Sequence, residues 1–300
     1  MYRNRFRGGL LLAAIVFILA SCGGTPLKPS MQGRLFFWKA QGVSNTVYLL
    51  GSIHLADSSI YPLDPVIESA LSNSDYVVVE LDVDKAKSKI NMLVAKEGMY
   101  HFPFTNSLKN DLPPELYDKV VAYGKKFGMN ASTLNIMKPW FAAFTFSGMN
   151  MINMGYTGEN GLESYVLGKV RSIKPILELE SAEFQIRIFS KMSLENQTAF
   201  LISQMLPADE LKREFENLYA SWKSGNIEQF TASVLGGKEQ WDGEVNKVLI
   251  YDRNITMADK IAGYLNGGGT YFVLVGAAHF VGYKGIISLL ENAGYKVIRY

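Results

Sequence analysis

The chain has few thiol or imidazole side chains: one cysteine and three histidines in 300 residues. A single cysteine excludes an internal disulfide framework and a cysteine-rich metal cluster. The sequence also lacks a Gly-rich phosphate loop ending in Lys-Ser/Thr, a Gly-x-Ser-x-Gly elbow and a His-Glu-x-x-His helix. Its charge is nearly balanced, with 30 basic and 28 acidic residues, so the composition does not indicate a nucleic-acid partner.

The N-terminus has the pattern of a bacterial lipoprotein signal. Three arginines within the first seven residues form a positive region, and residues 8–20 are apolar but too short to span a bilayer comfortably. Leu19-Ala20-Ser21-Cys22 then resembles a lipobox, in which a signal peptide over 1–21 is removed and Cys22 is acylated. The alternative is an ordinary signal peptide with an incidental cysteine.

This interpretation predicts a location at the bacterial cell envelope. Gly23 and Gly24 follow the cysteine with no aspartate there, which resembles sorting to the outer membrane, facing the periplasm or the cell surface. Removing residues 1–21 takes away three positive charges and no acid, which changes the formal net charge from +2 to −1. No later run is long and apolar enough for a membrane helix. We therefore expect a linker over 22–34 and a soluble body held at the membrane by its lipid.

Two segments at opposite ends of the chain share one pattern. Each is an apolar, β-favouring run that ends at a glycine and reaches a histidine three residues later, as Gly51-Ser52-Ile53-His54 and as Gly276-Ala277-Ala278-His279. A predicted helix and a further predicted strand follow in both places. This repeated order of strand, Gly-x-x-His, helix and strand indicates parallel strands of one sheet.

We predict an α/β fold with a central mixed, largely parallel sheet built from these two repeated units. Residues 35–300 are expected to form a single domain that opens with a hairpin over 35–50. A helical insert is expected over about 92–263, interrupted by a short strand at 175–180. Its Met-rich helices are more typical of a core than of a cofactor site.

Four ionisable residues fall at the carboxyl ends of predicted strands: His54, Glu80, Glu180 and His279. Ligands of α/β sheets bind at that edge, and two imidazoles with one or two carboxylates suit a divalent Mn, Co, Fe or Zn ion. A carboxylate that does not bind the metal could act as a general base on water. Each residue also has a structural alternative, such as a hydrogen-bonded histidine or, for Glu80, a buried salt bridge. His101 has no partner motif and is predicted to be structural or at the surface.

The paired Gly-x-x-His motifs resemble the TraB/GumN family, which includes the TIKI metalloproteases. The resemblance covers about 35–300 and extends well beyond the histidines. Its landmarks, in family order, are Tyr48 to His54, Tyr61-Pro62-Leu63, Val79-Glu80, Lys138-Pro139-Trp140, Leu179 to Gln185, Arg253-Asn254 and Gly276 to Gly282.

The resemblance implies an α/β domain in which both ends of the chain build one sheet around a helical middle. It also implies a divalent-metal site that uses His54, His279 and Glu80, with Arg253 facing the carboxylates. This chain departs from the family pattern at Gly161-Leu162-Glu163, which stands where Gly-x-Asp is expected. The longer acid could shift that carboxylate by about one methylene, so Glu163 is not assigned as a ligand.

The functional prediction is a lipid-anchored, divalent-metal-dependent hydrolase, a peptidase acting on a peptide or other small substrate. The catalytic candidates are Glu80, Arg253 and Glu180: Glu80 binds the metal or activates water, and Arg253 steadies acid groups or a developing oxyanion. Two alternatives stay open. One is a non-catalytic surface lipoprotein that holds a metal, haem or small ligand, and the other is a surface or adhesion factor with a vestigial site. Open metal positions beside an unbonded carboxylate would favour the hydrolase, and a closed coordination shell would favour the binding protein.

Overall fold

The structure is a computed structural model that describes residues 35–53, 60–103, 105–156, 161–236 and 243–300. These residues divide into two units. The helical unit contains Val83–Gly155 and Glu180–Arg213, and the sheet unit contains 35–82, Tyr156–Leu179 and Glu214–Tyr300. The division falls inside the helix α10 (Ala208–Lys223). Within the described ranges, no helix is both long and apolar enough to cross a membrane.

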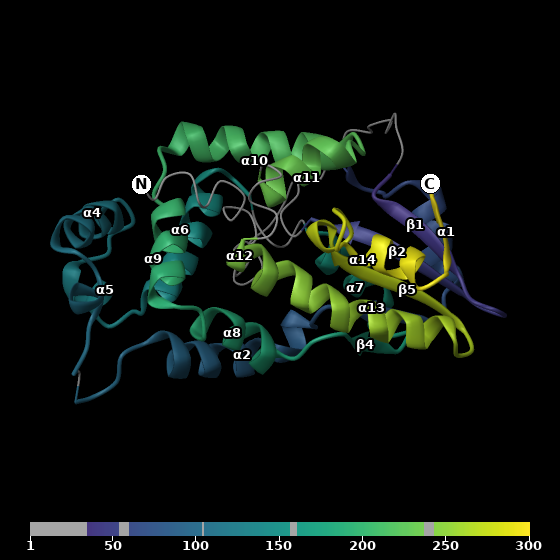
Figure 1. The fold of residues 1–300 in the computed structure, drawn as a ribbon, viewed down its shortest axis with the longest axis horizontal. Coiled ribbons are helices and arrows are strands. Elements are labelled where there is room, and N and C mark those ends of the chain that lie inside the picture. Colours follow the sequence, from purple (N-terminus) through teal and green to yellow (C-terminus); the bar gives the residue numbers. More distant parts are fainter. Residues whose placement is uncertain (1–34, 54–59, 104, 157–160, 237–242) are drawn as a thin grey trace. The chain divides into compact units, whose positions relative to one another are not determined.

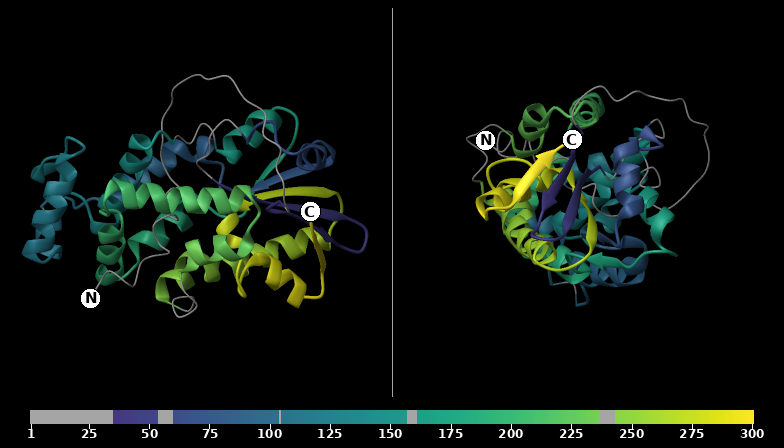
Figure 2. Two further views of the ribbon diagram at one scale, coloured as in Figure 1. Left: turned by 90° about the horizontal axis from the view of Figure 1, so that it is seen from above. Right: turned by 90° about the vertical axis from the view of Figure 1, so that its right-hand side faces the viewer.

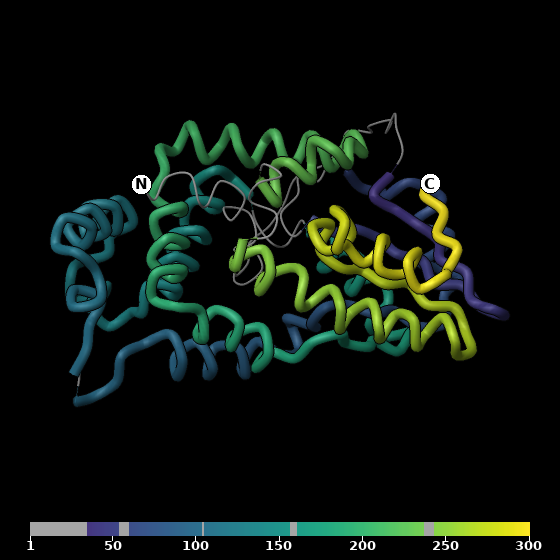
Figure 3. The backbone as a smooth tube through the Cα atoms, in the orientation of Figure 1, coloured from purple at the N-terminus to yellow at the C-terminus, as the bar shows by residue number. Residues whose placement is uncertain are grey.

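The sheet unit is built on six strands in the order β4-β3-β5-β2-β1-β6. Only β1 runs antiparallel to its neighbours, β2 and β6, while the other neighbouring pairs are parallel. The predicted hairpin and the mixed, largely parallel sheet are therefore confirmed, and Figure 3 shows the purple hairpin beside the yellow C-terminal strands. The strands are β1 (Phe37–Gln41), β2 (Thr46–Ser52), β3 (Tyr76–Val79), β4 (Ile176–Glu178), β5 (Thr270–Gly276) and β6 (Lys296–Arg299).

The central strands are apolar on both faces because helices cover both sides of the sheet. Val77, Val78 and Val79 of β3 are fully buried, as are the successive residues Phe272 and Val273 of β5. Such continuous apolar runs are typical of parallel strands packed between two layers of helices. This burial fixes the strands rigidly, so the residues at their carboxyl ends are held in defined positions.

The two repeated units cross the sheet in opposite directions. After β2 the chain passes through α1 (Pro65–Asn73) to β3, and after β5 it passes through α14 (Ile286–Asn292) to β6 on the other side. Right-handed crossovers in opposite directions place their helices on opposite faces. Figure 2 shows this for the blue α1 and the yellow α14. The neighbouring strands β2 and β5 thus form a topological switch point, where open α/β sheets bind ligands at their carboxyl ends.

The remaining helices of the sheet unit include the one that carries Arg253. This helix, α13, packs beside α14, and Figure 1 shows the two together next to the sheet. A π-helical segment, Lys247–Tyr251, runs directly into α13, and such segments are frequent at functional sites. The helices are α7 (Leu162–Val170), α11 (Ile227–Leu235), α12 (Glu244–Asn246) and α13 (Asp252–Leu265).

The helical unit confirms the prediction of a helical middle region. Helix α6 packs against α9 and α2 packs against α8. The core here is aromatic: the rings of Phe144 and Phe189 meet edge to face with centroids 4.5 Å apart, and Trp140 is fully buried beside them. The helices are α2 (Val83–Gly98), α3 (Leu108–Asp111), α4 (Pro114–Lys125), α5 (Ala131–Asn135), α6 (Pro139–Asn153), α8 (Ala182–Ser190) and α9 (Leu194–Ser203).

Candidate functional site

The two Gly-x-x-His motifs leave the sheet at the same edge. In the parallel pairing of β2 with β5, Gly51 lies opposite Val275 and Ser52 lies opposite Gly276. The motifs are therefore neighbours with a register offset of one residue, although more than two hundred residues separate them in the sequence. His54 lies outside the described residues, so its place beside the second imidazole stays a prediction.

Gly51 permits a close approach between the two motifs. A Cβ atom at this position would lie 3.1 Å from the Cβ and 3.2 Å from the Cα of Ala277, which belongs to the second motif. The Gly51 carbonyl accepts a hydrogen bond of 2.8 Å from the indole Nε1 of Trp222. The glycine thus gives the backbone room both to pass the second motif and to meet a buried indole.

Replacing Gly51 with valine should destabilise the sheet unit by about 1–3 kcal/mol, because the new side chain overlaps Ala277. The measurement is the free energy of unfolding in urea. Gly263→Ala is the control, since a Cβ at that helical position meets nothing within 4 Å. It should stabilise the protein by about 0.5–1 kcal/mol. A neutral Gly51→Val would show that the close approach has no energetic role.

Glu80 follows β3 directly and is only 7% exposed. Its Oε1 accepts a 2.7 Å hydrogen bond from the Gly276 N–H, and its Oε2 accepts one of 2.8 Å from Nη2 of Arg253. Arg253 is 3% exposed and also donates Nη1 to the carbonyl of Leu249 in the π-helical segment, at 3.1 Å. A buried carboxylate requires such partners, because an unpaired charge in this environment is strongly destabilising.

His279 lies on a short 3-10 turn, Ala277–His279, directly after β5, and is 1% exposed. Its Nδ1 is 2.6 Å from Oδ1 of Asn254, and the Asn254 Nδ2 donates to the carbonyl of Lys284 at 2.8 Å. That second bond fixes which end of the amide faces the ring. Because Oδ1 can only accept, Nδ1 carries the hydrogen, and a neutral His279 has its lone pair on Nε2.

The donor chemistry beside His279 suits a divalent cation. Nε2 of His279 is 3.9 Å from Oε1 of Glu80, so the ring in its neutral form and the carboxylate direct electron pairs toward the same region. An imidazole whose Nδ1–H is fixed by a carbonyl-type oxygen is the form that binds metals through Nε2. Among the described residues, no three His, Cys, Asp or Glu side chains gather into a metal-binding cluster. The third donor of the predicted set, His54, lies outside them.

Three other residues that the sequence analysis named are Glu180, His101 and Cys22. Glu180 follows β4, belongs to the helical unit and accepts a 2.9 Å hydrogen bond from Nε2 of Gln185, and its catalytic role stays a prediction. His101 is exposed, and its ring nitrogen Nε2 lies 2.9 Å from the carbonyl oxygen of Lys96. Cys22 lies outside the described residues.

Glu163, the residue that departs from the family pattern, contacts the end of β2. Its Oε1 accepts a 2.5 Å hydrogen bond from the Ser52 hydroxyl. The backbone N–H of Leu162 also reaches the carbonyl of Ile53, at 3.4 Å. The start of α7 is therefore attached to the strand that leads into the first Gly-x-x-His motif.

Sequence reasoning missed the role of Asn254, which orients His279. A signal was available, because Asn254 stands next to Arg253 near the start of a helix and on its buried side. An amide buried in a helix needs a specific hydrogen-bond partner. That requirement alone does not identify the partner as a histidine twenty-five residues further along the chain.

The chain is similar to proteins of one family over almost its whole length. The sequence model of the TraB/PrgY/gumN family matches residues 36–299. The uncharacterised protein YbaP of Escherichia coli K12 is 23% identical over 270 residues, covering 88% of this chain and 97% of YbaP. A metalloprotease TIKI homolog of Amphimedon queenslandica is 21% identical over 345 aligned residues, covering 96% of this chain and 66% of that protein. No solved structure matches significantly.

Proposed function

The chain belongs to the TraB/PrgY/gumN family, and from this premise we propose that it is a lipid-anchored, divalent-metal-dependent hydrolase that cleaves peptides. The observation that carries the proposal is the buried, hydrogen-bonded set of Glu80, Arg253, Asn254 and His279 at the carboxyl edge of the sheet. The description of the Amphimedon relative as a metalloprotease homolog supports metal dependence. The lipid anchor and the envelope location rest on the N-terminal sequence.

In this proposal, His54, His279 and Glu80 hold a Mn, Co, Fe or Zn ion. Such an ion, when bound, supplies Lewis-acid activation and lowers the pKa of a coordinated water. Asn254 holds the His279 ring so that Nε2 offers its lone pair. Arg253 balances the negative charge of Glu80 and keeps its carboxylate in place.

The geometry favours Glu80 as a ligand or charged neighbour of the metal over Glu80 as the general base. Both of its oxygens accept short hydrogen bonds, one from the Gly276 N–H and one from Arg253. A general base must direct a free lone pair at the attacking water, and hydrogen bonds already occupy a lone pair on each oxygen of this carboxylate. Its Oε1 nevertheless keeps further acceptor capacity on the side of His279.

The same observation favours a second candidate, a non-catalytic lipoprotein that binds a metal, haem or small ligand. A carboxylate engaged at both oxygens, together with the near-complete burial of His279, is typical of a structural or storage site. The two candidates share the metal-binding residues and differ in turnover.

Metal analysis of the purified full chain tests the shared part of both candidates. Bound metal should be lost from His54→Ala and from His279→Ala, because each change removes a ligand. His101→Ala is the matched control, since this third histidine is exposed and its ring bonds to a backbone carbonyl. If both ligand variants keep the metal content of the wild type, the proposed site is wrong.

Cleavage of a peptide library in the presence of Mn²⁺ or Co²⁺ separates the enzyme from the binding protein. The hydrolase predicts metal-dependent cleavage that disappears in His279→Ala and persists in His101→Ala. Tight metal binding without cleavage under either metal would overturn the peptidase and leave the binding lipoprotein.

A further inference from the structure

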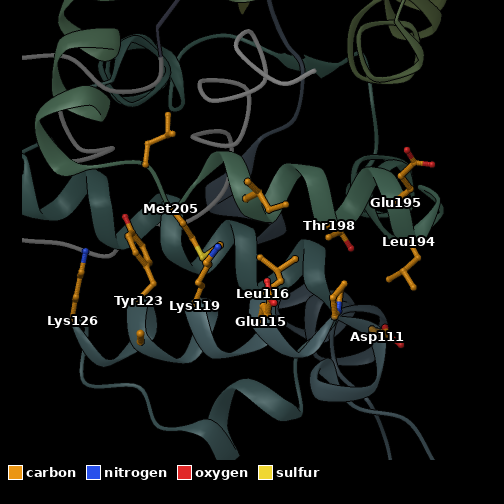
Figure 4. Close-up of a pocket in the computed structure, with 14 residues that line it drawn as sticks. Asp111, Glu115, Leu116, Lys119, Tyr123, Lys126, Leu194, Glu195, Thr198 and Met205 are labelled. Carbon is orange, nitrogen blue, oxygen red and sulfur yellow. The ribbon is translucent and has the colours of Figure 1, made fainter. Parts of the chain in front are cut away.

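The helical unit contains a groove between α4 and α9 that the proposed hydrolase does not use. It has a volume of about 860 Å³, within the range of about 300–1,000 Å³ of small-molecule sites. Each helix contributes one face, with residues spaced by about one turn, and Figure 4 shows these side chains. Leu116, Ala122 and Tyr123 of α4, together with Leu194 and Ile202 of α9 and with Met205 and Leu206 just after it, give the groove an apolar lining.

The polar group of Tyr123 is directed away from solvent and is already satisfied. Its hydroxyl donates to Oδ1 of Asn150 at 2.9 Å, and the Asn150 amide donates in turn to the carbonyl of Gln204, also at 2.9 Å. Burial raises the pKa of the Tyr123 phenol, so it stays neutral. Tyr123 therefore contributes an apolar ring to the lining of the groove.

The acidic residues at one end of the groove are stabilised by hydrogen bonds or by the helix dipole within the chain itself. The carboxylate of Asp111 accepts hydrogen bonds from the Tyr100 hydroxyl and, at 2.7 Å, from Nδ2 of Asn106. Glu115 and Glu195 lie in the first turns of α4 and α9, where the helix dipole favours negative charge. Figure 4 shows Asp111, Leu194 and Glu195 together at this end.

The cations at the other end lack acidic partners. Lys119 of α4 and Lys126, the C-cap residue of this helix, lie seven residues apart and both line the groove; neither forms an ion pair with a carboxylate of the described residues. The Lys126 ammonium lies 4.5 Å from the centroid of the Tyr123 ring. Figure 4 shows Lys126, Tyr123 and Met205 at this end. An apolar groove with two ammonium groups toward one end, neither of them in an ion pair among the described residues, is complementary to an anion with an apolar tail.

We propose that this groove binds a single-chain anionic amphiphile, with its acidic head at Lys119 and Lys126 and its tail between α4 and α9. The ten steps from Leu116 to Lys126 rise about 15 Å along the helix axis. An extended chain advances about 1.2 Å per atom, so the groove takes a tail of about twelve carbons. The two lysines thus select the charge of the head group, and the length of the groove selects the length of the tail.

The test uses the full chain in phosphatidylcholine nanodiscs and a photoactivatable analogue of dodecanoate. Crosslinks are mapped by mass spectrometry. We expect labelling of peptides from α4 and α9, competed by dodecanoate but not by dodecyltrimethylammonium, which has the same tail and the opposite charge. Lys119→Glu/Lys126→Glu should lower this labelling roughly tenfold, whereas Lys125→Glu, next to Lys126 but outside the groove lining, should not.

A second variant separates the tail from the head. Ile202→Trp places a larger side chain in the groove and should abolish labelling of both helices, while the far-ultraviolet circular dichroism of the chain stays unchanged. If labelling of α4 and α9 is absent in the wild type, the proposal is wrong. If labelling persists in the double lysine variant or is competed equally by the cationic amphiphile, the groove does not select anions and the proposal is also overturned.

Discussion

Arg253→Met is expected to lower the free energy of unfolding by about 3–5 kcal/mol. Arg253 and Glu80 are 3% and 7% exposed, and the guanidinium Nη2 donates to the carboxylate at 2.8 Å. Methionine matches the length of the arginine stem but leaves a buried negative charge whose one remaining strong donor, among the residues that the structure describes, is the Gly276 N–H. Breaking one half of a buried ion pair is far more destabilising than removing the whole pair, because the remaining charge keeps its desolvation penalty. Urea denaturation followed by circular dichroism measures the change.

Two further variants show whether this loss comes from the buried charge. Glu80→Gln/Arg253→Met removes both charges and should recover most of the stability that Arg253→Met loses. Lys247→Met breaks a neighbouring pair with Asp252 whose side chains are 61% and 49% exposed, at 2.7 Å, and should cost less than about 1 kcal/mol. Equal losses in Arg253→Met and Lys247→Met would contradict the assignment of Glu80 and Arg253 as a buried pair.

Local sequence patterns were sufficient to predict the strands and their direction. The runs 47–50, 77–79 and 272–275 are apolar throughout, and each is followed by glycine or a polar residue that ends the strand. The helices that follow β2 and β5 indicated parallel crossovers, and the structure confirms them. The sequence alone therefore predicts that ligands bind at the carboxyl edge of the sheet.

The order of the strands in the sheet could not be predicted from the sequence. β5 lies between β2 and β3, so the C-terminal half inserts into the N-terminal half. Strand pairing across more than two hundred residues depends on which apolar surfaces match after folding, and no local periodicity records it. The Arg171 guanidinium that binds both carboxylate oxygens of the buried Asp82 was missed for the same reason. Charged residues that pair across a fold leave no spacing signal in the chain.

The hydrogen bond between Asn254 and His279 leads to a prediction about the metal-free protein. Asn254 is fully buried, and its amide bonds at both ends, to His279 at 2.6 Å and to the carbonyl of Lys284 at 2.8 Å. Nitrogen-15 spectra should therefore show hydrogen on Nδ1 of the His279 ring. The chain has only three histidines, which simplifies the assignment.

Asn254→Leu removes this constraint and should change both the ring and the metal affinity. The variant leaves a buried ring donor unsatisfied, at a cost of about 1–3 kcal/mol, and it abolishes the preference for hydrogen on Nδ1. Loss of a group that orients a metal-binding histidine lowers metal affinity by about 10–100-fold. Asn246→Leu is the control, because Asn246 is also buried and donates to a backbone carbonyl, that of Leu235, at 3.1 Å. It should lose comparable stability but keep the His279 tautomer and the metal affinity. A spectrum with hydrogen on Nε2 in the wild type, or one unchanged in Asn254→Leu, would show that Asn254 does not set the state of the ring.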